Sequence, residues 1–440
     1  MGKIRNKTIK TMIRFTILAA LLGLSALLPA QNPVPALPQS RPIAIVGATV
    51  HPGNGQAAIA DAVVTFANGK ITAVTTRQAN PNLSGHEVVE AAGKHVYPGF
   101  IAPNTQLGLV EIEAVRATRD NAETGDMNPN VRSLIAYNTD SRVIPTVRAR
   151  GVLLGQITPE GGALAGSSSI VQLDAWNWED AALFPDDGQH LYWPNRFSYS
   201  WQTQSISKNE RYDQQVADLR QFLTEARGYC DQPAPKTANL KFEALCPIFK
   251  GERNLYVHAS LARDIEEAVL LAREFGARLV IVGGRDSYQV AGLLVENNVP
   301  VLLGQLHSLP AMNDTDIDQP YKTAAQLHRA GVRFGLTIGG FWQQRNLPFQ
   351  AGTAVAYGLP YEEAVRALTS ATADILGIGN RVGALAPGKD ATLFISAGDA
   401  LDMRSSVIER AYIEGRQLLL DDVQKTLYER FQEKYRRQKR

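Results

Sequence analysis

Two carboxamide side chains follow a short apolar segment at positions suited to contact a ligand. Asn104 and Gln106 stand one residue apart, shortly after Phe100 and Ile101. A carboxamide both donates and accepts hydrogen bonds. It is a weak ligand for zinc-like metals, which prefer imidazole, thiolate and carboxylate. Such side chains could recognise a polar ligand without a metal ion, or the site could be vestigial and filled by other side chains.

Two of the seven histidines follow apolar strand-like runs. His258 comes directly after residues 255–257, and His307 comes shortly after residues 301–303. We take Asn104, Gln106, His258 and His307 as the candidate ligand-binding residues, although His258 could equally be a core histidine retained for packing. The other five histidines are expected in loops or at the surface: His51, His86, His95, His190 and His328. Ser167, Ser168 and Ser169 have no recognisable His–acid partner, so no catalytic residue is predicted.

The elements that must position these residues alternate between strand and helix. Residues 279–282 form a continuous apolar run of the kind found in buried parallel sheets. Before it, residues 261–275 place apolar side chains on one face at helical spacing and end at Gly276. Further strands are predicted at 152–154, 170–173, 255–257, 301–303 and 332–337, with helices at 288–296 and 321–330. This alternation predicts an α/β protein with a (β/α)8 TIM barrel.

The residues before the barrel predict a small antiparallel sheet. Short β-branched runs at 43–46, 62–66 and 71–74 are separated by turn signals. Asn68-Gly69 between two of these runs predicts a tight hairpin, because both residues tolerate positive φ.

The run Pro98-Gly99-Phe100-Ile101-Ala102-Pro103-Asn104-Thr105-Gln106 resembles the first barrel strand of the metal-dependent amidohydrolases. In that family the run reads Pro-Gly-hydrophobe-Ile-Asp-x-His-x-His. Residues 367–377 resemble the family's helix ending in Ala-x-x-Leu-Gly, and residues 383–393 resemble its Gly-x-Leu-x-x-Gly-Lys-x-Ala-Asp-Leu segment. The resemblance covers roughly residues 41–420 and is closest to the imidazolonepropionase-like branch.

The resemblance implies a barrel with a small β-sandwich built from both ends of the chain. The predicted parts are a signal peptide at 1–30, a linker at 31–40, β-sandwich parts at 41–97 and 383–420, the barrel at 98–382 and a helical tail at 421–440.

The family norm is one or two divalent metal ions such as zinc, and most of the implied ligands are replaced here. Asn104 and Gln106 stand at the paired histidines of strand one, and Ala102 stands at the aspartate. His258 matches the histidine of strand five, whereas Gly283 stands where strand six would supply one. Strand eight runs into residues 338–340 without an acid, and no lysine is recognisable for strand four. We expect no bound metal and no other cofactor.

Composition bounds the compartment and the partners. The chain has 440 residues with 45% hydrophobic and 20% charged residues, which fits a globular protein. A basic start and an apolar run at 15–28 are typical of a secretory signal. Without its five basic residues the chain keeps 40 basic and 43 acidic residues, a net charge of about −3. We therefore expect a periplasmic or secreted protein that contacts neither nucleic acid nor, once the signal is removed, the membrane.

Three further features have two readings each. Cys230 and Cys246, the only cysteines, are expected to form a disulfide in an oxidising compartment, or else to be buried thiols. Aromatic residues between 176 and 201 either line a binding surface or fill the barrel's middle. In the tail, Val423, Leu427, Phe431 and Tyr435 recur every four residues. That helix either packs on its own barrel or binds a partner.

Together these features predict an exported amidohydrolase-like protein that is catalytically degenerate. It would act as a binding or partner subunit, as a homo-oligomer or beside an amidohydrolase relative, and bind a small polar ligand. The alternative is an active amidohydrolase that hydrolyses C–N bonds in peptides or cyclic amides.

Overall fold

The computed structural model describes residues 34–200, 202–233, 237–310 and 314–438. The predicted signal peptide and Trp201 lie outside these residues. Residues 35–440 form one compact unit. Within the described part of the chain, no helix combines the length and the apolar character needed to cross a membrane.

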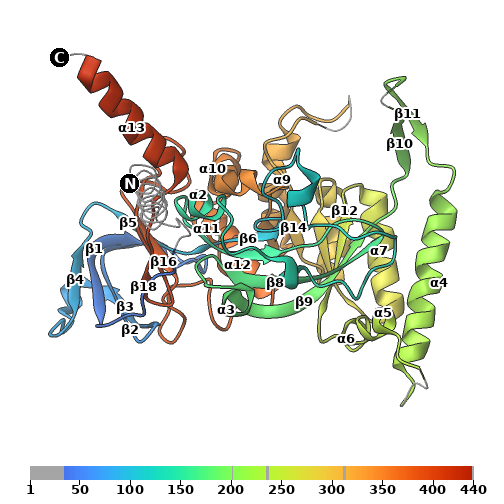
Figure 1. Ribbon diagram of the computed structural model, residues 1–440, viewed down its shortest axis with the longest axis horizontal. Helices are drawn as coiled ribbons and strands as arrows, with labels where there is room; N and C mark the ends of the chain where they lie inside the picture. The colour runs from blue at the N-terminus through green and yellow to red at the C-terminus, as the bar shows by residue number, and fades with distance from the viewer. Residues whose placement is uncertain (1–33, 201, 234–236, 311–313, 439–440) are drawn as a thin grey trace, which may run out of the picture. The chain divides into compact units, whose positions relative to one another are not determined.

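An eight-stranded sheet forms most of a barrel wall in the order β15-β14-β13-β12-β9-β8-β7-β6 (Figure 1). Its strands are β6 (Phe100–Thr105), β7 (Val152–Ile157), β8 (Leu164–Gln172), β9 (Ala182–Tyr192), β12 (Asn254–Ala259), β13 (Arg278–Gly283), β14 (Val301–Leu303) and β15 (Phe334–Leu336). Between β15 and β6 the wall is bridged by the Thr337 hydroxyl, which donates to the carbonyl of Pro103 at 2.7 Å. The predicted TIM-barrel fold is confirmed.

One strand departs from the regular barrel pattern. β8 runs antiparallel to both β7 and β9, whereas the other neighbouring pairs in the barrel sheet are parallel. A short turn at residues 158–163 joins β7 to β8, where a regular barrel would have a helix. The hairpin was not predicted from the sequence, because the apolar content of β8 indicates a buried strand but not the direction in which it runs.

Helices follow most of the parallel strands and cover the outside of the barrel. Apolar side chains from strands and helices form the largest core between the two layers. The helices are α2 (Ile144–Arg148), α3 (Trp178–Ala181), α4 (Tyr212–Cys230), α5 (Leu240–Glu243), α6 (Cys246–Phe249), α7 (Ala262–Phe275), α8 (Ala291–Glu296), α9 (Gln319–Ala330), α10 (Leu347–Ala356), α11 (Tyr361–Leu368), α12 (Ser370–Ile375) and α13 (Val423–Gln438). Gly276 and Gly331 end α7 and α9 in the left-handed conformation, as the sequence predicted for α7.

A second eight-stranded sheet contains strands from both ends of the chain. Its strands are β1 (Ile43–Val50), β2 (Ile59–Ala67), β3 (Lys70–Thr76), β4 (Glu87–Glu90), β5 (His95–Pro98), β16 (Leu393–Ser396), β17 (Ile408–Ile413) and β18 (Arg416–Gln417). The first half of β1 pairs with β4 and its end pairs with β5. The bend falls at Gly47, whose φ of +83° lies in the left-handed region that residues with a side chain rarely adopt. The two halves of the predicted sandwich therefore belong to one connected sheet around its own apolar core.

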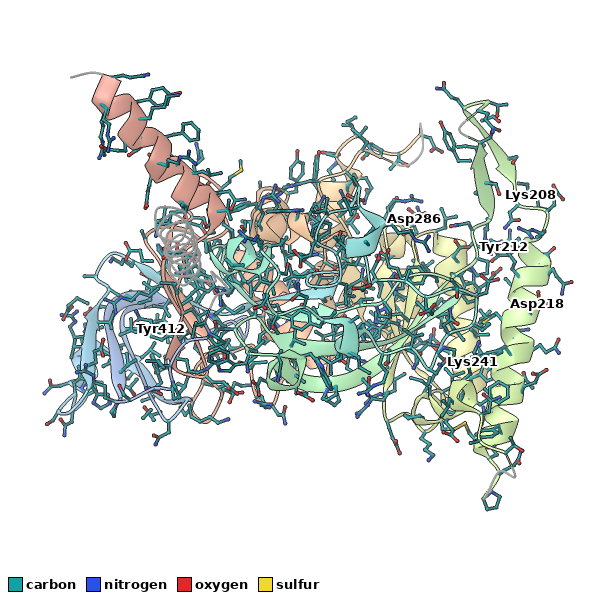
Figure 2. All side chains as sticks on the ribbon, viewed as in Figure 1. Lys208, Tyr212, Asp218, Lys241, Asp286 and Tyr412 are labelled. Atoms are coloured by element: carbon teal, nitrogen blue, oxygen red, sulfur yellow. A yellow bond between two sulfur atoms is a disulfide. The ribbon has the colours of Figure 1, made fainter. Side chains whose placement is uncertain are left out.

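A third, two-stranded sheet stands apart from the others. β10 (Phe197–Ser200) and β11 (Ser205–Lys208) pair only with each other, in an antiparallel hairpin between β9 and α4. Figure 2 labels Lys208 at the end of β11 and Tyr212 at the beginning of α4. Phe197 and Ile206 are exposed, so the hairpin at the end of the aromatic stretch does not fill the barrel.

The tail helix α13 does not pack on the barrel. Val423, Leu427, Phe431 and Tyr435 are 42% to 56% exposed, and none of the described residues of α13 is buried. Its base is held by the Thr146 hydroxyl, which donates to Gln424 Oε1 at 2.8 Å. The interpretation of this helix as a packed element is wrong, because its apolar face points to solvent.

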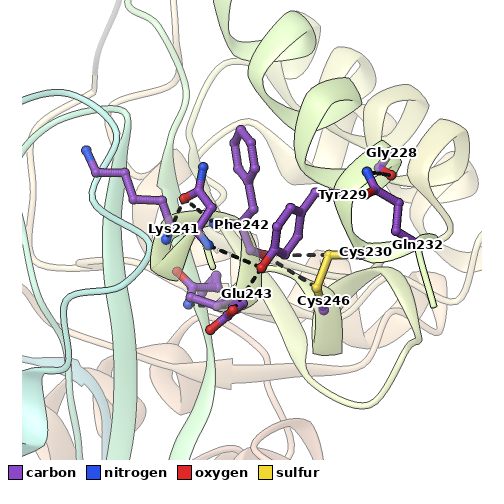
Figure 3. The surroundings of a disulfide bond; sticks show 11 residues. Gly228, Tyr229, Cys230, Gln232, Lys241, Phe242, Glu243 and Cys246 are labelled. Carbon is purple, nitrogen blue, oxygen red and sulfur yellow. Dashed lines mark hydrogen bonds between the residues drawn. A yellow bond between two sulfur atoms is a disulfide. The ribbon is translucent and has the colours of Figure 1, made fainter. Parts of the chain in front are cut away.

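Cys230 at the end of α4 and Cys246 at the start of α6 form a disulfide, with their Cα atoms 5.4 Å apart (Figure 3). Both sulfur atoms lie within 3.5 Å of the Phe242 carbonyl oxygen. The bond joins α4 to the α5–α6 segment that leads into β12.

Reduction of this disulfide should lower the free energy of unfolding by about 3 kcal/mol, because the bond closes a short loop in the unfolded chain. Urea unfolding with and without a reductant measures the difference. A double variant, Cys230→Ser with Cys246→Ser, should have the lower stability and no response to the reductant, since the chain has two cysteines. Equal stability of oxidised and reduced protein would contradict the expectation.

Candidate functional site

The side chains inside the barrel form two layers along the strands, the first apolar and the second polar. Ile101, Leu154, Ile170, Val280 and Leu302 point inward from five strands and belong to one buried cluster. Residues 373–382, in and after α12, close this end with further apolar side chains. Because side chains two positions apart share a face of a strand, Gln156 and Ser168 lie one layer further along from Leu154 and Ile170.

The polar layer is a connected set of side chains that we call the barrel network. All its members lie on β7, β8, β9 or β12 and form hydrogen bonds with one another: Gln156, Ser168, Asp187, His190, Tyr256 and His258.

Asp187 is the charged centre of the barrel network. Its Oδ1 accepts from the Ser168 hydroxyl at 2.7 Å. Its Oδ2 accepts from Tyr256 OH at 2.6 Å and from Gln156 Nε2 at 2.8 Å. The carboxylate is 1% exposed, and three donors from three different strands compensate for its lost hydration.

Two histidines extend this network towards the ends of β9 and β12. His258 Nε2 lies 2.9 Å from His190 Nδ1, and His190 Nε2 lies 2.9 Å from Ser168 Oγ. Since Ser168 gives its hydroxyl hydrogen to Asp187, its oxygen must accept from His190 Nε2. The Nδ1 atom of neutral His190 is then an acceptor, so the hydrogen of the contact with His258 belongs to His258 Nε2.

Tyr192 covers His258 at the end of β9. The two rings stack with their centroids 3.9 Å apart and their planes inclined by 16°. Tyr192 OH donates to the carbonyl of Pro159 at 3.2 Å, which holds the ring in place. On the other side, the His190 ring stacks on Tyr256 with centroids 4.7 Å apart.

Burial raises the pKa of the carboxyl in the network and lowers the pKa of its two imidazoles. Desolvation raises the pKa of Asp187 to about 6, against the lowering effect of its hydrogen bonds to Tyr256, Ser168 and Gln156. Desolvation lowers the pKa of His258 to about 3 and that of His190 well below its ordinary value. Near neutral pH the network therefore holds one carboxylate and two neutral imidazoles.

Asp187→Asn should lower the free energy of unfolding by about 1–3 kcal/mol, because the amide nitrogen would face a buried donor instead of accepting from it. The neighbouring Asp186 provides a matched control, since it is half-exposed and paired with Arg132. Asp186→Asn should change stability by less than about 1 kcal/mol. Urea unfolding near neutral pH checks both variants, and equal losses would contradict a special role for the buried carboxylate.

The free energy of unfolding should fall as the pH drops from about 6.5 towards 4, because the unfolded chain protonates its histidines before the native His190 and His258 do. Asp187 has the opposite effect on the free energy of unfolding between about pH 6 and pH 3.8, because its pKa is higher in the native state than in the unfolded chain. The net effect is a loss of stability, because two histidines contribute to the loss and one carboxyl opposes it.

His258→Gln should reduce this pH dependence by about 1 kcal/mol per pH unit over that window. Urea unfolding at a series of pH values measures the slope. His86→Gln, in the loop before β4, serves as the control and should keep the slope of the parent protein. An unchanged slope in His258→Gln would show that His258 is not held neutral.

Asn104 and Gln106 lie at the end of β6, but only one of them touches the network. Asn104 has a φ of +52°, a left-handed conformation that Asn adopts more readily than most residues. Its backbone N–H donates to Gln156 Oε1 at 3.1 Å, where the pairing of β6 with β7 shifts register. Among the described residues, the Gln106 side chain has no hydrogen-bond partner.

His307 belongs to a different place. Its Nε2 lies 2.7 Å from the Thr353 hydroxyl oxygen on α10, and the residue lines a cavity of about 490 Å³ together with Phe349, Tyr361 and Asp399. No hydrogen bond joins His307 to the barrel network in the described part of the chain. Of the four candidate residues, the hydrogen bonds thus link only His258 and Asn104.

The residues at the family's ligand positions do not fit a catalytic divalent metal ion. Such a site needs about three protein ligands and an open position, whereas His258, through its free Nδ1, is the one imidazole at these positions. Gly283 and Gly284 have φ of +95° and +56°, so a side chain there would be strained. Within the described residues, no three His, Cys, Asp or Glu side chains are grouped so that they could hold a metal.

Sequence reasoning missed several of these residues. His190 and His51 were expected in loops or at the surface, and both are buried because each stacks on a tyrosine and bonds to a second histidine. Ser168 does have His and acid neighbours, in the order Asp187–Ser168–His190. Because the serine lies between the other two and is fully buried, it is not placed as a nucleophile.

The aromatic stretch between 176 and 201 splits into separate environments. Trp193 is buried and donates to Tyr212 OH at 3.0 Å, whereas Trp176 is exposed. Two of its residues contact the barrel network: Tyr192 stacks on His258, and the backbone N–H of Trp193 donates to the carbonyl of His258 at 3.2 Å. The stretch therefore does not form a single pocket.

Comparison with known proteins agrees with the barrel and extends over most of the chain. A model of the amidohydrolase family matches residues 254–419. The amidohydrolase tasK of Hapsidospora irregularis is 21% identical over 393 residues, which are 80% of this chain and 39% of that protein. The chain thus spans about two fifths of the length of this curated relative.

Solved structures include two informative neighbours. An amidohydrolase from Thermotoga maritima MSB8 is 26% identical with a TM-score of 0.73, and the match covers 86% of this chain and 99% of that chain. A prolidase in complex with N-methylphosphonate-L-proline is 16% identical with a TM-score of 0.53, over 86% of this chain and 99% of that chain. At that identity the prolidase supports the fold alone.

Proposed function

Because this chain belongs to the amidohydrolase superfamily, we propose that it is a member that has lost the catalytic metal ion and acts as a binding or partner subunit. The observation that carries the proposal is the ligand set: within the described residues, no three His, Cys, Asp or Glu side chains are grouped so that they could hold a metal ion. His258, which matches the family's strand-five ligand, donates its Nε2 hydrogen to His190 and keeps only its Nδ1 free. One imidazole cannot hold a catalytic metal ion, which needs about three protein ligands.

A polar small molecule is the ligand we propose for this barrel end. The tautomer derived for His258 leaves its Nδ1 as an acceptor, and the carboxamides of Asn104 and Gln106 provide both donors and acceptors. A partner subunit, either another copy or an amidohydrolase relative, is the second element of the proposal. His307 is left out of the proposed ligand contacts, because it bonds to Thr353 on α10 and lines a cavity with Tyr361 and Asp399.

Export to an oxidising compartment is also part of the proposal. The disulfide between Cys230 and Cys246 supports it, because disulfides persist mainly outside the reducing cytosol. The basic and apolar residues before position 31 support it independently.

An active hydrolase of C–N bonds in peptides or cyclic amides remains the second candidate. It is favoured by the 26% identity to the Thermotoga maritima amidohydrolase over 99% of that chain. Function is set by the site rather than by the fold, and for this reason the metal-free candidate is preferred.

Purified protein should contain far less than one equivalent of zinc, iron or manganese per chain, because the ligand set does not fit. Elemental analysis after purification without chelators measures this. Added zinc should produce no hydrolysis of dipeptides or cyclic amides. His258→Ala is the control: one tightly held metal per chain that this variant loses, together with zinc-dependent hydrolysis, would overturn the proposal in favour of the active enzyme.

A further inference from the structure

The tail helix α13 presents an apolar face that the described part of the chain leaves uncovered. At about 100° per residue, Val423, Leu427, Phe431 and Tyr435 advance by 40° at each step and form one stripe. Tyr428 lies at the edge of this stripe and is also exposed. We call these five residues the tail face.

The charges of α13 are segregated around the tail face. Arg430 and Arg437 border it along the side of Val423, and Lys434 lies between Val423 and Leu427. Both acidic residues of the helix, Glu429 and Glu433, lie away from the tail face, on the side that also carries Lys425 and Arg436. Lys434 Nζ is 5.7 Å from the ring centroids of both Phe431 and Tyr435, so its stem covers apolar surface while its ammonium stays at the edge. Glu433 is occupied by an ion pair with Arg437 at 2.8 Å.

The tail is strongly positive, whereas the rest of the chain is negative. Residues 423–440 carry seven basic and two acidic side chains, a net charge of +5. Residues 31–422 carry 33 basic and 41 acidic side chains, a net charge of −8. Pairing of two tail faces would bring two strongly positive segments together, which is unfavourable.

We propose that α13 attaches the protein to an anionic phospholipid surface, with the tail face in the interfacial region and the bordering basic residues among the lipid headgroups. An amphipathic helix with low overall hydrophobicity, apolar and aromatic residues on one face and basic residues beside it has the properties of an interfacial helix. Negative lipids attract the tail and repel the acidic remainder of the chain, so the protein binds by α13. This revises the expectation from sequence that no membrane contact follows removal of the leader.

Cosedimentation with vesicles tests the proposal on protein carrying residues 31–440, which include the whole compact unit. Vesicles of phosphatidylcholine alone are compared with vesicles of equal parts phosphatidylcholine and phosphatidylglycerol. Binding is expected only to the anionic vesicles and should be released by high salt.

Two matched pairs of variants locate the binding surface. Phe431→Ser should weaken binding about tenfold or more, because it removes one large apolar contact. Ile206→Ser, on the exposed hairpin, should have no effect. Lys434→Gln with Arg437→Gln should weaken binding more than Lys425→Gln with Arg436→Gln, which removes the same charge from the other side of the helix. Circular dichroism checks that each variant is folded.

Any of the following results would overturn the inference. The first is no binding to either kind of vesicle. The second is equal binding to neutral and anionic vesicles. Equal weakening by Phe431→Ser and Ile206→Ser would also overturn it. The last such result is a concentration-dependent dimer in light scattering that Phe431→Ser abolishes while vesicle binding is absent, which would assign the tail face to a second copy of the chain.

Discussion

The interior of the barrel is organised by one buried carboxylate. Asp187 accepts from Gln156, Ser168 and Tyr256, which come from three separate strands, so a single negative charge holds β7, β8, β9 and β12 in register. A buried carboxylate without these donors would be strongly unfavourable. The positions of the remaining polar groups follow from this requirement: Ser168 turns its hydrogen to Asp187, His190 turns its Nε2 hydrogen to Ser168, and His258 turns its own to His190.

This arrangement has a role comparable to that of a metal ion. In both cases a central charge joins side chains from several strands at the ends of a barrel. A metal ion polarises the groups bound to it and activates water, whereas the members of the barrel network pair with one another and leave His258 Nδ1 as an acceptor at the edge. Tyr192 lies over its last imidazole and reinforces that closure. A network whose side chains pair with one another stabilises the barrel, and its edge can recognise a ligand by hydrogen bonds.

Sequence patterns predicted the barrel where each element has a distinct local signal. β14 was predicted at its observed bounds because Val301–Leu303 is a continuous apolar run between turns, and α7 was found because its apolar positions recur at helical spacing. β9 was missed because Pro185, two aspartates and Gly188 have the composition of a turn. The network could not be predicted for the same reason: it depends on β9 and on the antiparallel β8, which bring residues distant in sequence together. Asn104 was identified correctly as unusual, but part of the reason for Asn is its backbone conformation rather than its chemistry.

The barrel and the terminal sheet are each closed by contacts between residues that lie far apart in the sequence, and this limits when each can form during synthesis. The barrel is bridged by Thr337 and Pro103, which are 234 residues apart. The terminal sheet likewise needs β16 to pair with β5. The barrel and the terminal sheet can close only after residues in the last third of the chain, Thr337 and β16, have been synthesised. Bringing such distant residues together is slow. During synthesis, the growing chain therefore carries exposed strand edges that only its final segments can cover.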